Sequence, residues 1–258
     1  MPKPVSIVCE KWAAIIEARP DYFMRRTLGP MIITAREKLS KMINCHVNEC
    51  VIVPNASHGI ATVLFNLHLK AGDILVNCRF SPRYCGYYRL SSQGFLVSTT
   101  YGPVRQSLQY YADRISGLVV SSIHLSLPMT HHSIVVMFQQ HLSSLPRHDG
   151  QRIVAVIDSI ISQPGVVLPW EEMVAVCKEQ SVFSLVDAAQ CLGQVKVDLN
   201  AIQPDCWISV RIESSAFLLL LTLPRPAELP QMAIEQAQQR RSICTAKVRV
   251  GARNISPD

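Results

Sequence analysis

The order of apolar and polar positions along the chain predicts alternating helices and strands. Apolar residues recur every three or four positions in several segments, which is typical of amphipathic helices: 5–18, 31–43, 60–69, 134–145 and 170–179. Short apolar runs between polar turns predict buried strands: 51–54, 74–77, 95–99, 117–122, 152–158 and 184–186. Because strands alternate with helices, we expect crossover connections and a mainly parallel sheet covered on both faces.

Breaks in this pattern divide the chain. Pro20 and Gly29-Pro30 are expected to interrupt the helices of the N-terminal part. All seven tyrosines precede residue 112 and the last tryptophan is Trp207, whereas a leucine run at 217–223 and Gln- and Arg-rich sequence follow. We therefore expect an N-terminal helical segment (1–48) packing on a large domain (49–209), and a divergent tail (210–258).

Composition narrows the functional classes. Hydrophobic residues make up 48% of the chain and charged residues 17%, enough for a sizeable core. The net charge of +6 is scattered, which favours a small anionic ligand over nucleic acid. The nine cysteines form no Cys-x-x-Cys motif, and no N-terminal apolar segment or membrane-length run precedes or follows them, so we expect reduced thiols, a cytoplasmic location and no membrane partner. The pair His131-His132 lacks neighbouring ligands, so no metal site is expected.

Three polar segments follow apolar strands, where open α/β sheets bind ligands. Asn55-Ala56-Ser57 opens a helix whose N–H groups and dipole favour an anion, although Asn55 could simply cap the helix. In the third segment, Asp158 to Gly165, Ser162 and Gln163 could face the same cleft, or the segment could be only a turn closed by Pro-Gly.

The second segment, Asp187-Ala-Ala-Gln190, carries the most specific chemistry. A carboxylate at the end of a buried strand is costly unless it is paired, and a protonated pyridine nitrogen is a suitable partner. Gln190 could then donate to a phenolate oxygen of the same ring. The alternative is that Asp187 only caps the following helix.

Together, these segments resemble the class V aminotransferase family of pyridoxal 5'-phosphate (PLP) proteins, in the isopenicillin N epimerase-like and cysteine desulfurase-like branch. The resemblance covers roughly residues 4–209 and is carried by the runs 53–57, 154–169 and 185–199. It implies a fold type I large domain, an α/β protein with a three-layer α/β/α sandwich around a mixed, mainly parallel sheet. The C-terminal small domain of the family is expected to be missing.

The resemblance also implies a cofactor, PLP, and roles for individual residues. Asn55, Ala56 and Ser57 would hold the phosphate, and Tyr84 would stack on the ring unless it is an ordinary half-buried loop tyrosine. Asp187 would pair with the ring nitrogen, Gln190 would contact the phenolate oxygen, and Ser162 would face the ring. His58 is interpreted as a helix-start residue. A homodimer and an amino-acid substrate are implied, with C–S lysis or desulfuration, epimerisation or transamination as the reaction.

One essential residue does not match. The Schiff-base lysine of the family falls at the position of Glu213, in the segment Val210-Arg-Ile-Glu-Ser-Ser215, and a carboxylate cannot form an imine. Lys196 and Lys247 are interpreted as solvated surface residues. Two hypotheses remain: a PLP-dependent enzyme acting on an amino acid or a derived intermediate, and a catalytically inactive truncated paralogue or mis-spliced gene product.

Overall fold

A seven-stranded mixed sheet organises the chain. The computed structural model describes residues 3–80, 100–126, 128–162, 165–210 and 219–222. The strands are β1 (Cys50–Val53), β2 (Ile74–Phe80), β3 (Val119–Leu125), β4 (Ile153–Asp158), β5 (Phe183–Ala188), β6 (Cys206–Val210) and β7 (Leu219–Thr222). Their order is β1-β7-β6-β5-β4-β2-β3, and β7 pairs antiparallel with both of its neighbours whereas β3, β2, β4, β5 and β6 are parallel.

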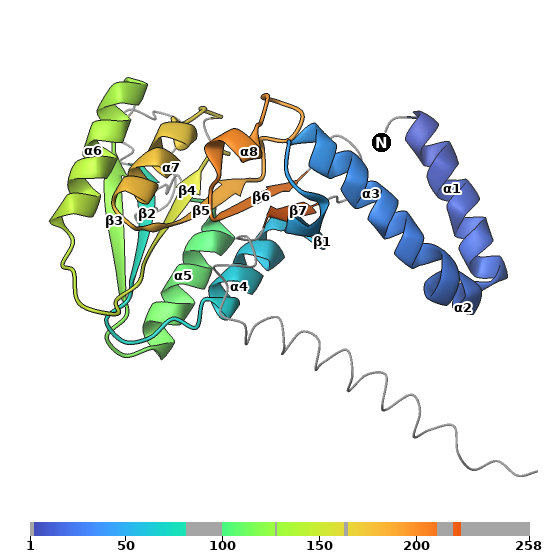
Figure 1. The fold of residues 1–258 in the computed structure, drawn as a ribbon, viewed down its shortest axis with the longest axis horizontal. Helices are drawn as coiled ribbons and strands as arrows, with labels where there is room; N and C mark the ends of the chain where they lie inside the picture. Colours follow the sequence, from blue (N-terminus) through green and yellow to red (C-terminus); the bar gives the residue numbers. More distant parts are fainter. Residues whose placement is uncertain (1–2, 81–99, 127, 163–164, 211–218, 223–258) are drawn as a thin grey trace, which may run out of the picture. The chain divides into compact units, whose positions relative to one another are not determined.

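Helices cover both faces of this sheet (Figure 1). One layer holds α4 (Ala56–Asn66) and α5 (Gly102–Arg114), and the other holds α6 (His131–Ser144), α7 (Trp170–Glu179) and the short α8 (Leu199–Ile202). Strand β4 shows why the layers form: Ile153, Ala155 and Ile157 join the core beneath α6 and α7, whereas Val154 and Val156 join the core beneath α4 and α5. The predicted three-layer α/β/α sandwich is confirmed.

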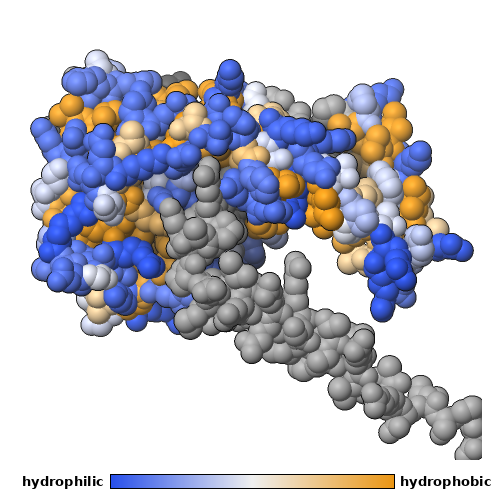
Figure 2. Space-filling view, viewed as in Figure 1, coloured by the Kyte–Doolittle hydropathy of each residue, from blue (hydrophilic) through white to orange (hydrophobic). Residues whose placement is uncertain are grey.

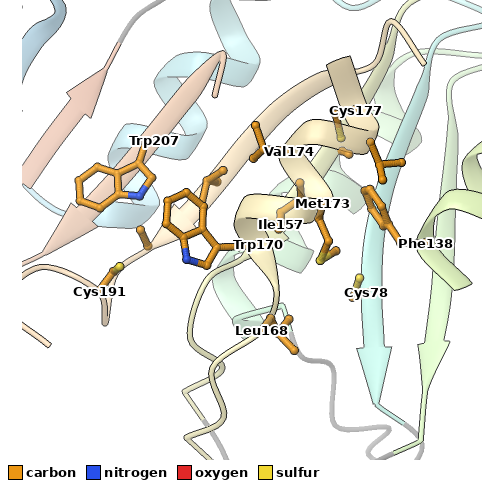
Figure 3. Packing of buried hydrophobic residues seen from close by; sticks show 14 of the residues in the cluster. Cys78, Phe138, Ile157, Leu168, Trp170, Met173, Val174, Cys177, Cys191 and Trp207 are labelled. Carbon is orange, nitrogen blue, oxygen red and sulfur yellow. The ribbon is translucent and has the colours of Figure 1, made fainter. Parts of the chain in front are cut away.

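The larger of the two cores lies between α6, α7 and the sheet (Figure 3). Trp170 and Met173 of α7 pack there with Phe138 of α6 and Trp207 of β6, and all four side chains are at most 3% exposed. Cys78 and Cys177 lie in the same core as small apolar groups. Burial raises the pKa of both thiols, so they remain protonated.

The N-terminal segment consists of α1 (Lys3–Ala18), α2 (Pro20–Tyr22), a π-helical turn (Phe23–Thr27) and α3 (Leu28–Met42). The expected break at Gly29-Pro30 is wrong, because α3 begins at Leu28. The preceding π-helical turn shifts the hydrogen-bond register there, and a proline lacking an N–H is tolerated in a first helical turn.

Only the end of this segment joins the sheet domain. Leu39 and Ile43 enter the larger core, and Arg36 donates to the carbonyl oxygens of Cys50 (2.6 Å) and Val47 (2.7 Å). In contrast, no residue of α1 is buried, and Ile7 and Val8 are more than half exposed. Figure 2 shows apolar surface on this N-terminal segment. Packing of the whole N-terminal segment on the large domain remains a prediction.

The sheet also continues past the boundary expected at residue 209. Part of the leucine run forms β7, which fills the place between β1 and β6, and the compact unit extends to Leu223. A change in composition cannot show that a leucine run pairs with a strand nearly 170 residues earlier in the chain, and the domain boundary itself remains a prediction. In the described residues, no helix is both long and apolar enough to cross a membrane.

We expect Phe138→Ala to lower the free energy of unfolding by about 3–5 kcal/mol, because it empties a closely packed core site. Phe65→Ala is the matched control: Phe65 is 66% exposed, so its loss should change stability by less than about 0.5 kcal/mol. Urea denaturation of both variants measures the difference, and equal effects would contradict the described core.

Candidate functional site

A cleft of about 490 Å³ lies where the parallel strands end. Its lining comes from the segment after β1, from the ends of β4 and β5 and the residues that follow them, from the last residue of β6, and from Tyr101. The lining residues are Asn55, Ala56, Ser57, Tyr101, Asp158, Ile160, Ser162, Asp187, Ala189, Gln190 and Val210. The carboxyl ends of parallel strands converge at one edge of a sheet, which explains how residues 155 positions apart share one cleft. Its volume is within the range of about 300–1,000 Å³ that holds small ligands and cofactors.

The first wall of the cleft is the start of α4. Asn55 caps this helix, since its side-chain oxygen accepts a hydrogen bond from the N–H of His58 (2.8 Å). The N–H groups of a first turn have no acceptors within their helix, so those of Ala56 and Ser57 are available to a ligand. The helix dipole and the Ser57 hydroxyl add to these N–H groups in favouring an anion at this wall. The N-cap interpretation of Asn55 and the anion-site interpretation are therefore compatible.

Two buried acids, Asp158 and Asp187, form the part of the cleft that favours a cation. They are register partners at the ends of β4 and β5, and they are 4% and 5% exposed. Thr100 donates to Asp158 (3.3 Å), and the N–H of Ala189 donates to Asp187 (3.1 Å). Burial raises the pKa of Asp187, and the Ala189 hydrogen bond partly opposes this shift. Two neighbouring buried acids make this part of the cleft favourable for a cationic group.

Tyr101 completes the cleft from the start of α5. Thr100 is held at the end of β2, because its N–H and hydroxyl both donate to the carbonyl oxygen of Cys78, at 3.5 and 3.2 Å. This contact places the next residue, Tyr101, at the cleft, where its ring is half exposed. An aromatic ring in this position is available to a flat ligand.

The structure brings six of the seven predicted cofactor-site residues into this cleft: Asn55, Ala56, Ser57, Ser162, Asp187 and Gln190. Tyr84 and the lysine-equivalent position Glu213 lie outside the described residues. Tyr101 and Asp158 line the cleft but were not predicted as site residues. The signal for Asp158 was present, because it ends a fully apolar run as Asp187 does.

Comparisons with known proteins show which proteins the chain is similar to. No protein-family model matches it. It is 29% identical over 243 residues to an L-cysteine desulfhydrase-like protein, lolT1, of Epichloe uncinata, covering 94% of this chain and 48% of the relative. An L-cysteine desulfhydrase of Arabidopsis thaliana is 31% identical over 77% of this chain and 42% of its own. Isopenicillin N epimerase of Amycolatopsis lactamdurans is 26% identical, with coverage of 74% and 43%.

Solved structures share the fold. The cystine C–S lyase C-DES has a TM-score of 0.58 and 18% identity, covering 81% of this chain and 51% of its own in a lysine-to-alanine variant with glycine covalently linked to its PLP cofactor. The cysteine desulfurase CsdA of Escherichia coli has a TM-score of 0.56 and 14% identity, covering 76% of this chain and 45% of its own.

These similarities support the class V aminotransferase-like family of PLP-dependent proteins. The family resemblance of the sequence is thereby confirmed. The chain spans about half the length of the curated relatives it matches.

The raised pKa of Asp187 predicts how ligand-free stability depends on pH. The folded state favours the protonated acid, so this contribution to stability is present below about pH 4 and is lost as the pH rises through the raised pKa. Asp187→Asn cannot ionise, so we expect it to increase the free energy of unfolding more at pH 8 than at pH 5. The expected difference is about 1 kcal/mol or more, because one pKa unit corresponds to about 1.4 kcal/mol.

Urea denaturation at the two pH values measures this difference. Asp149→Asn, at an exposed loop position, is the control and should have the same small effect at both. A pH-independent effect of Asp187→Asn would show that burial does not disfavour the Asp187 charge.

Proposed function

We propose that the cleft binds PLP and that the protein acts on a sulfur-containing amino acid of the L-cysteine type. The observation that carries the proposal is the presence, in one cleft, of an anion-binding helix start and a buried carboxylate. PLP has a phosphate for the first and a basic ring nitrogen for the second. These two features of the cleft alone match the two charged groups of PLP.

The described residues fit the contacts that a PLP site makes with the ring and the phosphate without a covalent bond. Asp187 is buried and receives a single neutral N–H donor among the contacts described, so a protonated ring nitrogen would supply the missing positive charge. Ala189, with its small side chain, lets a ring approach the backbone, and Gln190 offers an amide to an oxygen on the ring. The first turn of α4 would hold the phosphate.

Each residue then has a distinct task. PLP, when bound, supplies an electron-withdrawing ring that stabilises negative charge developing on an attached amino acid. Asp187 keeps the proton on the ring nitrogen, and without that proton the ring withdraws electrons poorly. Ser57 and the α4 N–H groups fix the phosphate, and Tyr101 packs against the ring and limits access of water. Ser162 and Gln190 orient the polar groups on the ring's edge.

The substrate class rests on the relatives. Several similar relatives are L-cysteine desulfhydrases or proteins like them, and the fold neighbours include a cystine C–S lyase and cysteine desulfurases. These names favour C–S bond cleavage over epimerisation or transamination for this chain. A homodimer and a cytoplasmic location, both expected from the sequence, remain predictions.

The missing lysine supports a second candidate, a non-catalytic PLP-binding protein. The chain has eight lysines: Lys3, Lys11, Lys38, Lys41, Lys70, Lys178, Lys196 and Lys247. Seven of them belong to the described residues and none of these seven lines the cleft. The segment 211–218, between β6 and β7, contains no lysine at all. Lys247 lies outside the described residues, so a covalent link through it is the alternative to test, and the solved lysine-to-alanine variant of C-DES carries glycine covalently linked to its PLP cofactor.

We expect Ser57→Asp to weaken PLP binding by about tenfold or more, because a carboxylate in the first turn of α4 repels the phosphate. The same change should leave stability intact or raise it slightly, since an acid favours a helix N-terminus by about 0.3–1 kcal/mol. Calorimetric titration with PLP and urea denaturation separate the two effects.

Ser133→Asp is the matched control, because Ser133 lies in the first turn of α6 and does not line the cleft. It should share the effect on stability and leave PLP affinity unchanged. Equal loss of affinity in both variants would place the phosphate away from α4.

The position of Tyr101 makes a separate prediction about ring stacking. We expect Tyr101→Ala to weaken PLP binding by about tenfold, as befits the loss of an aromatic contact, and Tyr101→Phe to bind within about twofold of the unmodified chain. Tyr84→Ala in the same titration tests the stacking role that the sequence predicts for Tyr84. If Tyr84→Ala weakens binding and Tyr101→Ala is neutral, Tyr84 and not Tyr101 is the stacking residue.

A further inference from the structure

We propose that Thr100 is a positioning residue of the cleft: it holds Tyr101 in the cleft wall and so sets how tightly a ring binds there. Thr100 itself is not among the residues that line the cleft, whereas Tyr101 is. This role rests on the proposed function, because it takes the ring of PLP to lie against Tyr101. It also assigns part of the ring affinity to a residue outside the cleft.

Thr100 is almost completely buried, with 1% of its surface exposed, and it joins three elements of the fold. Its hydroxyl group donates to the carbonyl oxygen of Cys78 in β2 (3.2 Å) and to Oδ2 of Asp158 at the end of β4 (3.3 Å). Its N–H donates to the same Cys78 oxygen over a longer distance, 3.5 Å. One hydroxyl hydrogen shared between two acceptors is a three-centre hydrogen bond, so both strand ends hold the residue that precedes Tyr101.

The Tyr101 side chain has no comparable anchor among the contacts that the structure describes. It is 51% exposed, and it makes no capping hydrogen bond although Tyr101 is the N-cap residue of α5. Pro103 in the first turn of α5 lacks an N–H, and the helix buries only Val104 and Leu108. The place of the Tyr101 ring therefore depends on the backbone, which Thr100 fixes one residue earlier.

A fixed Tyr101 raises the affinity for a flat ring because the ring meets a wall that is already in place. Without the Thr100 hydroxyl, Tyr101 samples several positions, and binding must order it again. The free energy of this ordering is subtracted from the binding free energy, which is how preorganisation affects affinity. The phosphate should not share the loss, because among the described hydrogen bonds none joins Thr100 to the start of α4.

Variants of Thr100 test the hydroxyl group directly. Thr100→Val removes it with little change of shape, and we expect this variant of the full chain to bind PLP about fivefold more weakly in calorimetric titrations, as for the loss of one hydrogen bond. Thr100→Ser keeps the hydroxyl and should bind within about twofold of the unmodified chain. Thr100→Ala, which places no methyl group beside the Asp158 carboxylate, should show the same loss if the valine variant does not fold. Equal losses in the serine and valine variants would overturn the role of the hydroxyl.

A double-mutant cycle shows whether Thr100 acts through Tyr101. Tyr101→Ala alone is expected to weaken binding about tenfold, and the variant that also carries Thr100→Val should bind no more weakly than this. Independent effects would multiply to about fiftyfold, and that outcome would overturn the inference. Ser57→Asp is the matched control, because Ser57 belongs to the α4 wall: its effect and that of Thr100→Val should multiply, to about fiftyfold or more.

Bound PLP offers a second signal that does not depend on affinity. PLP is not chiral, so its absorption band shows circular dichroism only where an asymmetric site fixes the ring. At saturating PLP, Thr100→Val should reduce this signal per bound ligand, as Tyr101→Ala should. If Thr100 only stabilises the fold, Thr100→Val lowers the urea midpoint and leaves the signal unchanged, which would contradict a positioning role.

The remaining outcomes separate this inference from the proposed function. If the unmodified chain and Thr100→Val bind PLP equally well, the role of Thr100 is overturned and the PLP site stands. The same holds if Thr100→Val weakens binding and Tyr101→Ala does not, because Thr100 then acts without Tyr101. If the unmodified chain does not bind PLP, both are overturned.

Discussion

The burial of two carboxylates side by side is the constraint on which the rest of the site depends. Asp158 and Asp187 stand at the ends of adjacent strands with almost no exposure to water. Removing an ionised carboxylate from water costs several kcal/mol after relaxation, and one backbone N–H bond to Asp187 offsets only part of this. A cleft of this kind is stable in an uncharged state or with a cation bound, and it gains most from a ligand that brings positive charge into it.

The sheet makes this arrangement possible without local strain. Helices cover both faces of strands β4 and β5, so the side chains of these strands reach a ligand only at the strand ends. Those ends lie at the edge of the sheet where α4 begins. That edge joins a region of positive potential at the α4 start to a region of negative potential at the two acids. A ligand with an anionic and a cationic end therefore has a single favourable orientation in the cleft, and the fold rather than any one side chain determines it.

Much of the sheet and of the cleft could be predicted from the sequence, because the patterns that indicate them are local. The runs that end at Val53, Asp158 and Asp187 are short, apolar and followed by polar residues, so both the strands and the chemistry at their ends are visible locally. Tyr101 was missed because its place in the cleft depends on Thr100 returning to Cys78 across 22 residues, a contact that no local pattern encodes. Helix α5 escaped notice for a related reason, since only Val104 and Leu108 of its 13 residues are buried. Strand β7 depends on pairing with β1 and β6, which is equally nonlocal.

The absent lysine changes what the same cleft can do without changing its shape. A lysine contributes a covalent hold on the cofactor, a proton carrier beside the substrate and one positive charge next to the acids. The segment 211–218 contains no lysine, and Glu213 falls at the position that matches the family's lysine. The described lining of the cleft likewise includes no lysine, whereas the start of α4 and the two buried acids are present. These features favour a phosphate-bearing ring with a protonated nitrogen whether or not a covalent bond holds that ring.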